Sequence, residues 1–367
     1  MLRDRVPMAR LLAFASVILA ATPLACASSE RPSGPQYEDF TCTVVREALL
    51  ERGACTYAEP VALADPMLAR GIDVALGGTG EAKPISACVA AGIVNLRFQG
   101  NRTYVHDLGG LDQLPNLQTL DVSNNQIRDL GPLRGARALM HLDVSNNPVA
   151  ELAPLADVPQ LTTLDANSTD VRDLAPLARA KQLRALFVSG ARVSDLQPIA
   201  ALPLEQLEVR ETDVVDLAPL AAVTGLRHLD AGSNRITSLA PLASLSALEV
   251  LYVGATQIAD LAPLAKLSNL RVVHAAGTGV RSLEPLRGLS KLAWVWISNA
   301  PIDDLSPLEG KTELRQLNVY STPVRSLAPV ADLPRLEGVY ASSTPLDAAS
   351  RDVVAPALRA RGVRVVL

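Results

Sequence analysis

Hydrophobic residues make up 49% and charged residues 20% of the 367-residue chain, a composition that excludes a disordered polypeptide. The formal net charge of −4 gives no basic footprint for nucleic acid, so we expect no nucleic-acid partner. Aromatic residues account for only 3% of the chain, which makes the places where they gather informative.

Residues 1–25 have the organisation of an export signal. Arginines near the N-terminus precede an uncharged apolar run that is shorter than a typical membrane span. The run ends in TPLAC, which resembles the lipobox of bacterial lipoproteins, although Pro23 stands where that family usually has Leu. The resemblance implies lipidation of Cys26, and ordinary cleavage after the triplet Ala25-Cys26-Ala27 is the alternative. We therefore expect an exported lipoprotein of the bacterial cell envelope, or a secreted protein if Cys26 is not lipidated.

The segment between this signal and residue 92 is expected to have two parts. Residues 26–40 hold the lipid-anchor cysteine and a polar, proline-containing stretch that reads as a flexible tether. Residues 41–92 contain helical patterns near 44–52 and 84–91. We expect this second part to be a helical N-terminal cap.

Three cysteines, Cys42, Cys55 and Cys88, follow the signal. An exported chain permits a disulfide, and three thiols allow one pair with one left over. The spacing leaves the pairing open. No CxxC, HExxH or other metal-binding spacing occurs, so we expect neither a metal ion nor another cofactor.

From residue 93 to 346 the chain repeats one motif: LDVSNNQIRDLGPL at 120–133 returns as LDVSNNPVAELAPL at 142–155. Around the second leucine, apolar and polar residues alternate, which is the period of a short strand. Every step between neighbouring complete units is 22 residues except one of 21 into Leu207. A fixed period predicts a solenoid, in which stacked units bury the leucines that one unit cannot bury alone. The motif leucine, or a valine in its place, stands at Leu96, Leu120, Leu142, Leu164, Leu186, Leu207, Leu229, Leu251, Val273, Val295, Leu317 and Val339.

LQTLDVSNNQI at 117–127 matches the pattern L-x-x-L-x-L-x-x-N-x-L and so resembles the leucine-rich repeat family. The DLxPL tail and the 22-residue spacing are similar to the internalin class of bacterial surface proteins. The resemblance implies an α/β repeat solenoid, a curved horseshoe with a parallel β-sheet on its concave side and short 3₁₀ turns on its convex side. It says little about the ligand, because repeat folds serve many partners.

Other recurring residues are interpreted as scaffold. The motif asparagine stands at Asn101, Asn125, Asn147 and Asn234, where we expect the side chain to bond backbone groups of the next unit. Asp or Ser stands three residues before a repeated proline, which is typical of a capped short helical turn. The open ends of the stack need covers, so residues 41–92 and 347–367 are expected to be caps.

The remaining positions face outward from the expected concave sheet. His141 and His228 stand at two of these positions. The ring residues chosen for the predicted site are Phe187, Tyr252, His274, Trp294, Trp296 and Tyr340, with Tyr320 next to them. Exposed aromatics gathered on one face mark binding hot spots, so we predict a ligand-binding site. Stacking of the rings across strands, with no ligand, is the alternative.

Acidic residues lie on the same face. Asp121, Asp143 and Asp165 fall on adjacent strands, and Asp230 stands farther along beside His228. These carboxylates can be bonded to neighbouring polar groups, can bind basic groups of a partner, or can hold a cation, although no known calcium-loop pattern is present. We include all four in the predicted ligand-binding face.

Catalysis has little support. Neither His141 with Asp143 nor His228 with Asp230 has an identifiable nucleophile, and an open sheet excludes water poorly. We expect a non-enzymatic, monomeric protein that binds a protein partner and touches the membrane only through its lipid. A glycan stacked on Tyr252, Trp294 and Trp296 is one alternative, and a structural spacer without a ligand is another.

Overall fold

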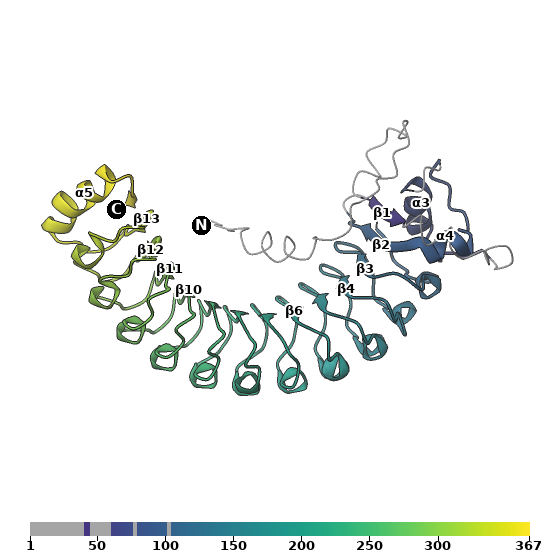
Figure 1. Cartoon of the computed structure of the whole chain (residues 1–367), viewed down its shortest axis with the longest axis horizontal. Helices are drawn as coiled ribbons and strands as arrows, with labels where there is room; N and C mark the ends of the chain where they lie inside the picture. Colours follow the sequence, from purple (N-terminus) through teal and green to yellow (C-terminus); the bar gives the residue numbers. More distant parts are fainter. Residues whose placement is uncertain (1–39, 45–59, 76–78, 101–103) are drawn as a thin grey trace.

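The computed structural model describes residues 40–44, 60–75, 79–100 and 104–367. A single curved sheet contains fourteen strands in sequence order, from β1 to β14. Strand β1 pairs antiparallel with β2, and the strands from β2 onward are parallel. The sheet lines the inner side of an arc and the 3₁₀ turns form its outer side (Figure 1). The predicted horseshoe solenoid is therefore confirmed.

The bounds of the elements follow the repeat. The strands are β1 (Phe40–Val44), β2 (Ile93–Phe98), β3 (Thr119–Asp121), β4 (His141–Asp143), β5 (Thr163–Asp165), β6 (Ala185–Phe187), β7 (Gln206–Glu208), β8 (His228–Asp230), β9 (Val250–Tyr252), β10 (Val272–His274), β11 (Trp294–Trp296), β12 (Gln316–Asn318), β13 (Gly338–Tyr340) and β14 (Arg364–Val366). The 3₁₀ turns are Leu111–Gln113, Gly131–Leu133, Ala153–Asp157, Ala175–Arg179, Gln197–Ile199, Ala218–Ala222, Ala240–Leu242, Ala262–Leu264, Glu284–Leu286, Ser306–Leu308 and Ala328–Val330. The helices are α3 (Pro66–Ala75), α4 (Ala87–Gly92) and α5 (Ala355–Ala360), with a π-helical turn at Ser350–Val354.

The motif leucines form the centre of one continuous core. Leu96 pairs with Leu120, and Leu120 with Leu142, so the strands align on the same residue of each unit. The same alignment holds across the 21-residue step, where Leu186 pairs with Leu207. All five side chains are 0–1% exposed. Loss of one residue outside the strand therefore leaves the stacking intact.

The side chains of the motif asparagines bond to the preceding unit and not, as was expected, to the next one. Asn147 donates to the carbonyl of Val122 at 2.8 Å and accepts from the N–H of Ile127 at 2.9 Å, and both residues belong to the preceding unit. It also donates to Val144 of its own unit at 3.0 Å. Thr256, at the same position, makes the intra-unit bond alone, to Val253 at 2.6 Å. The prediction of bonds to the next unit is therefore wrong, because the motif does not specify on which side the amide lies.

The convex turns are capped from just outside. The Asp129 carboxylate accepts the N–H of Gly131 at 2.7 Å, and the Ser238 hydroxyl accepts that of Ala240 at 3.1 Å. The residue at the cap position itself is a leucine without a capping side chain, as at Leu130. The capping function of the Asp and Ser positions is confirmed, one residue earlier than in an ordinary N-cap.

The N-terminal end contains a strand as well as helices. Residues 40–44 form strand β1, which completes the edge of the sheet beside β2. The helix expected near 44–52 falls almost wholly outside the described residues, and α4 overlaps the second expected helix, near 84–91. The buried Asp65 carboxylate, 5% exposed, accepts N–H groups from Met67 and Leu68 in the first turn of α3 and from His106 in the first unit. That carboxylate ties the cap to the repeats. The signal, Cys26, Cys55 and Asn101 lie outside the described residues.

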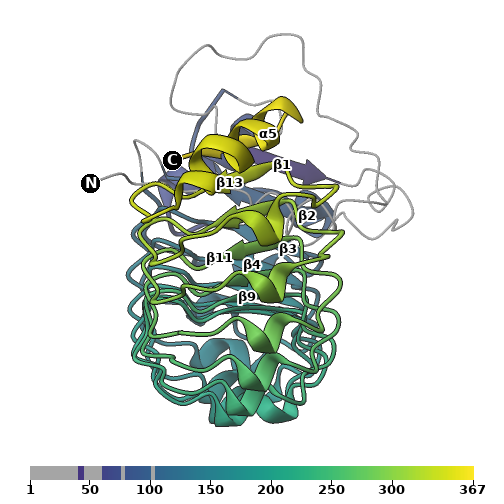
Figure 2. The ribbon, with the colours of Figure 1, turned by 90° about the vertical axis from the view of Figure 1, so that its left-hand side faces the viewer.

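The C-terminal end is covered by a helical segment followed by β14. The π-helical turn ends just before Pro356, which lacks the N–H that a regular α-helical turn would use there. Gly362, at φ 86°, ends the helix and allows the chain to return to the sheet. Helix α5 lies over the end of the stack (Figure 2). Among the described residues, no helix is long and apolar enough to cross a membrane.

The bonds of the motif asparagine to the preceding unit can be tested by substitution. Asn147→Ala leaves the Val122 carbonyl and the Ile127 N–H without their side-chain partner, whereas Thr256→Ala removes only one intra-unit bond. We expect Asn147→Ala to lower the free energy of unfolding by about 2–3 kcal/mol and Thr256→Ala by about 1 kcal/mol. Urea unfolding of the two variants measures the difference, and equal losses would contradict the inter-unit role of the asparagine.

Candidate functional site

Four rings on the concave side form a continuous cluster across β8 to β11. His228 and Tyr252 have ring centroids 5.7 Å apart, Tyr252 and His274 5.7 Å, and His274 and Trp296 5.5 Å in an edge-to-face arrangement. Tyr252 also reaches Trp296 at 6.4 Å. These spacings lie in the range of favourable aromatic pairs. We call His228, Tyr252, His274 and Trp296 the concave ring cluster.

Glycine in the preceding unit makes room for this cluster. A Cβ atom at Gly254 would lie 2.4 Å from Cε1 of His274, so the imidazole packs directly on the bare backbone. Gly232, one unit earlier, is similarly covered by the Arg210 guanidinium, whose Nη1 would lie 2.8 Å from a Cβ there. The His274 ring thus leans over the preceding unit, and its placement depends on the glycine just after β9.

Burial keeps the imidazoles neutral. It lowers the pKa of His228 to about 4, and it lowers the pKa of His274, to which the nearby Arg210 charge contributes. Burial also raises the pKa of Asp230 and of Tyr252, and for Tyr252 the Asp230 carboxylate adds to the effect. At neutral pH the cluster is therefore an uncharged aromatic surface. Within the described part of the chain, Nδ1 of His274 is the one buried side-chain nitrogen or oxygen without a hydrogen-bond partner.

The other predicted aromatics divide into two groups. Trp294 is partly exposed on the same strand as Trp296, and Tyr320 is 44% exposed. Tyr340 lies across Gly338, with the Arg364 guanidinium 5.8 Å from its ring centroid. Phe187 is only 7% exposed, so it offers almost no surface to a partner. The sequence places Phe187 on the correct face but does not reveal how deeply the ring packs.

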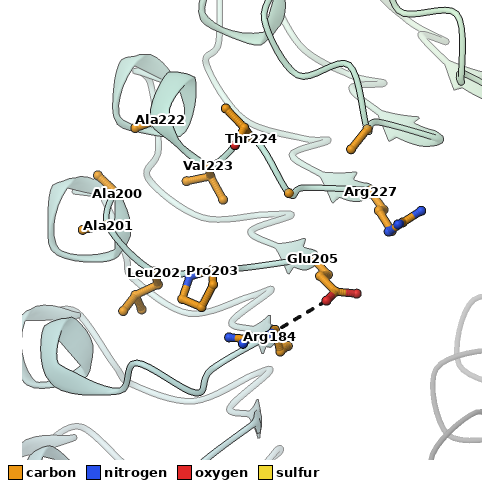
Figure 3. A pocket seen from close by; sticks show the side chains of 12 residues that line it. Arg184, Ala200, Ala201, Leu202, Pro203, Glu205, Ala222, Val223, Thr224 and Arg227 are labelled. Carbon is orange, nitrogen blue, oxygen red and sulfur yellow. Dashed lines mark ion pairs between the residues drawn. The ribbon is translucent and has the colours of Figure 1, made fainter.

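The concave side is open, and a groove lies elsewhere. About 670 Å³ of space occurs between the units at Leu202 and Val223, on a flat side of the arc where the chain enters the strands (Figure 3). None of the four rings of the concave cluster lines it. The ring cluster is thus a half-buried surface on the open concave side and not the wall of this groove.

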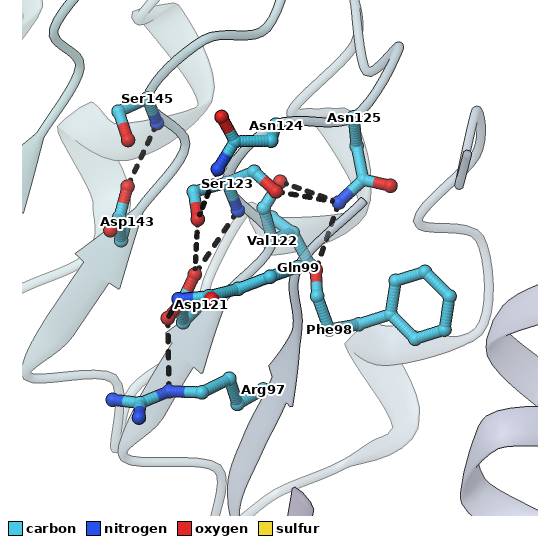
Figure 4. Close-up of polar contacts among 10 residues, drawn as sticks. All are labelled: Arg97, Phe98, Gln99, Asp121, Val122, Ser123, Asn124, Asn125, Asp143 and Ser145. Carbon is cyan, nitrogen blue, oxygen red and sulfur yellow. Dashed lines mark hydrogen bonds and ion pairs between the residues drawn. The ribbon is translucent and has the colours of Figure 1, made fainter. Parts of the chain in front are cut away.

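The acidic residues at the other end are used within the fold. Asp121, Asp143 and Asp165 are adjacent in register, as predicted. Asp121 is 3% exposed and bonds the Arg97 guanidinium and the Gln99 amide, each at 2.9 Å (Figure 4). Its neighbours accept backbone N–H groups two residues ahead, Asp143 from Ser145 at 2.9 Å and Asp165 from Asn167 at 3.0 Å. This geometry favours carboxylates bonded to neighbouring groups over a site for basic groups of a partner.

Arg97 and Gln99 were missed in the sequence analysis. Leu96 pairs with Leu120, which sets Arg97 beside Asp121. The contact could therefore have been predicted by aligning the first unit with the second. Across the described ranges, no group of three His, Cys, Asp or Glu side chains is placed to hold a metal ion.

Comparison with known proteins supports the repeat assignment. The family described as Leucine Rich repeats (2 copies) matches residues 94–135 and 224–266. An internalin (inlF) from Listeria monocytogenes is 26% identical with a TM-score of 0.77, over 85% of this chain and 92% of that one. Internalin C2 of the same organism is 29% identical with a TM-score of 0.51, over 65% and 98%. The chain is an internalin-like leucine-rich repeat protein.

A more distant likeness shows the fold alone. The leucine-rich repeat ectodomain of the plant receptor kinase GASSHO1/SCHENGEN3 from Arabidopsis thaliana, solved in complex with CASPARIAN STRIP INTEGRITY FACTOR 2, is 15% identical with a TM-score of 0.59. The match covers 69% of this chain and 36% of that one. No curated protein matches the chain significantly. Internalin-like leucine-rich repeats are typically protein-interaction modules without enzymatic activity.

The neutral His228 imidazole makes stability depend on pH. The unfolded chain takes up this proton near pH 6.5 and the folded chain near pH 4, so the unfolded state binds more protons between these values. The contribution of His228 to the free energy of unfolding therefore falls as pH drops from about 6.5 to about 4. His228→Gln should reduce the loss between pH 7 and pH 4 by about 2–3 kcal/mol, measured by urea unfolding.

Asp230 acts in the opposite direction in acid, because its raised pKa lets the folded state take up a proton first. That effect is common to the parent protein and the variant, so the difference between them isolates His228. Equal pH slopes for the two proteins would contradict the assignment of a neutral, buried imidazole.

Proposed function

We propose that this protein binds a protein partner through the concave side from β8 to β13, with no enzymatic step. The observation that supports the proposal is the concave ring cluster, whose four rings lie in mutual contact on an open surface. The four residues are half-buried, and aromatic clusters that keep part of their surface accessible are where interface energy concentrates. Trp294 and Tyr320 extend the surface, and Asp230 supplies a polar group at its β8 end.

The uncharged state of the cluster favours this use. Burial keeps His228 and His274 neutral, so a partner can cover the rings without the cost of burying two imidazolium charges. Another protein with this fold, the plant receptor ectodomain, is solved with a bound factor.

The test is a pull-down from cell-envelope extracts with the parent protein and a Tyr252→Ala/Trp296→Ala variant. The variant removes two central rings, and we expect at least a hundredfold loss of affinity for the captured partner, since two hot-spot residues are lost. Tyr104→Ala is the matched control, because Tyr104 is an aromatic residue 43% exposed outside the concave side. Circular dichroism checks that each variant is folded.

The outcomes separate the classes of ligand. A partner retained by the double variant and by the control would refute binding through the ring cluster. Capture of a glycan on an array, abolished in the double variant, would instead favour stacking of sugar rings on Tyr252 and Trp296. An absence of any partner for the parent protein would favour a structural spacer.

We further propose that the protein is exported and held in the cell envelope by a lipid on Cys26, with residues 1–25 as the cleaved signal. The TPLAC lipobox-like stretch supports this, and residues 26–40 would be the tether between lipid and fold. Cys26→Ala should release the protein into the soluble fraction after cell lysis, whereas Cys42→Ala should leave it with the membranes. Membrane retention of the Cys26→Ala variant in fractionation would contradict the lipid anchor.

A further inference from the structure

The groove on the flat side of the arc arises from the one irregular step of the repeat. Most units have ten residues from the repeated proline to the motif leucine, but the unit from Pro198 to Leu207 has nine. The missing residue falls in the segment that crosses the flat side, where Ala200, Ala201 and Pro203 line the groove (Figure 3). We call the side of the arc where the chain enters the strands the entry flank.

Charged residues of alternating sign run along this flank. The position two residues before the motif leucine holds, in successive units, Arg184, Glu205, Arg227, Glu249 and Arg271. After these five units the row continues with an uncharged residue and then with another Arg and Glu. All of these charged side chains are partly or fully exposed. A row of this kind has no dominant sign, so it suits a surface that is itself alternating.

The row ends with Ala293, Arg315 and Glu337. Its charges pair within the chain, Arg184 with Glu205 at 3.9 Å, Arg227 with Glu249 at 2.7 Å and Arg315 with Glu337 at 2.5 Å. Exposed pairs of this type are worth about 1 kcal/mol or less, so exchanging them for pairs with a second surface costs little. The backbone of the flank is already used: the carbonyl of Arg227, for example, accepts the N–H groups of Glu249 and Val250.

A second row of residues, farther toward the convex side, differs in side-chain size along the flank. In the first half of the charged stretch the residues four before the motif leucine are Gln182, Pro203, Gly225 and Ala247, three of them small or compact. Pro203, Gly225 and Ala247 line the groove. The first half of the entry flank is therefore hollow.

The second half carries long polar residues in the same row: Asn269, Lys291, Glu313 and Arg335. Lys291 donates to the Asn269 side chain at 2.7 Å, and Arg335 pairs with Glu313, so these side chains are held along the flank. One half of the entry flank contains the groove and the other half carries the longer side chains, so we take the surface to be complementary to its own reverse.

We infer that the entry flank binds a second copy of this chain across a twofold axis. The axis lies in the plane between the two flat sides and passes between the units of Glu249 and Arg271. Because the molecule is an arc with flat sides (Figure 1), this rotation lays one arc on the other in reverse order. An interface of this type is isologous, so each patch must match itself reversed.

The reversal brings opposite charges together in three of the four facing pairs. Arg184 faces Glu337 of the second copy, Glu205 faces Arg315, and Glu249 faces Arg271. The fourth facing pair, Arg227 with Ala293, has one charged and one uncharged residue, so no like charges meet. In the second row, the residues of the first half, from Gln182 to Ala247, face the longer side chains of the second copy, from Arg335 back to Asn269. Charge and side-chain length therefore agree on the same twofold axis. The proposed dimer differs from the monomer that the sequence analysis expects.

The test uses charge reversal in the purified full-length protein, with sedimentation equilibrium as the readout. The parent protein should have twice the mass of one chain, and its dissociation constant should rise with salt. Glu205→Arg sets like charges against Arg315 of the second copy at two symmetric places, and Arg315→Glu does so against Glu205. We expect each to raise the dissociation constant by at least a hundredfold, because facing like charges oppose association strongly.

Mixing the two variants provides the decisive measurement. In a mixed pair, the Arg at 205 faces the Glu at 315 and the native Glu205 faces the native Arg315, so a heterodimer should form although neither variant pairs with itself. Residues 205 and 315 precede β7 and β12, so they do not contact each other within one chain. Rescue by mixing therefore cannot arise from repaired folding.

Arg227→Glu is the matched control. It disrupts the internal pair with Glu249 but faces Ala293 in the proposed dimer, so it should change the dissociation constant less than about threefold. A parent protein that stays monomeric at all protein and salt concentrations would overturn the inference. A dimer unaffected by Glu205→Arg and Arg315→Glu, or single variants that do not associate on mixing, would also overturn it.

Discussion

Mutual burial of leucine between neighbouring units is the interaction on which the rest of this structure depends. One unit contributes a three-residue strand and a short turn, too little to enclose its own apolar side chains. Stacking removes Leu120, Leu142 and their counterparts from water and aligns the strands in the same step. The two ends of such a stack expose unpaired units, which explains why the buried Asp65 and helix α5 matter: each fastens a cover to an otherwise open core.

The same constraint separates scaffold from surface. Positions that face the core, the asparagine turn or the convex cap have little freedom, because a change there affects two units. Concave and flank positions are free to vary, since only their own side chains project there. Gly254 shows that the separation is incomplete: it lies in the turn after β9, yet its missing Cβ lets His274 of the next unit join the concave ring cluster.

Periodicity explains which features could be predicted. Strand register and convex turns recur in every unit. The same residue pattern is therefore seen many times, and an atypical residue in one unit does not change the prediction. Non-periodic features failed: β1 joins the sheet through an antiparallel contact with β2 that no local pattern signals. Burial depth was not predicted either, since Phe187 and Asp121 are buried at concave positions where most other units have half-buried residues. For Asp121 the decisive neighbour, Arg97, lies in the least regular unit.

The concave side and the entry flank are perpendicular surfaces of one arc, so use of one leaves the other open. A twofold pair joined through the flanks would hold two concave ring clusters on the same side, because the axis runs along the radius of the arc. Two linked sites bind a partner presented on a surface far more tightly than one, without any new contact. In such a pair the 21-residue step would have a physical role, because the groove beside the shortened unit would face the longer side chains of the reversed arc.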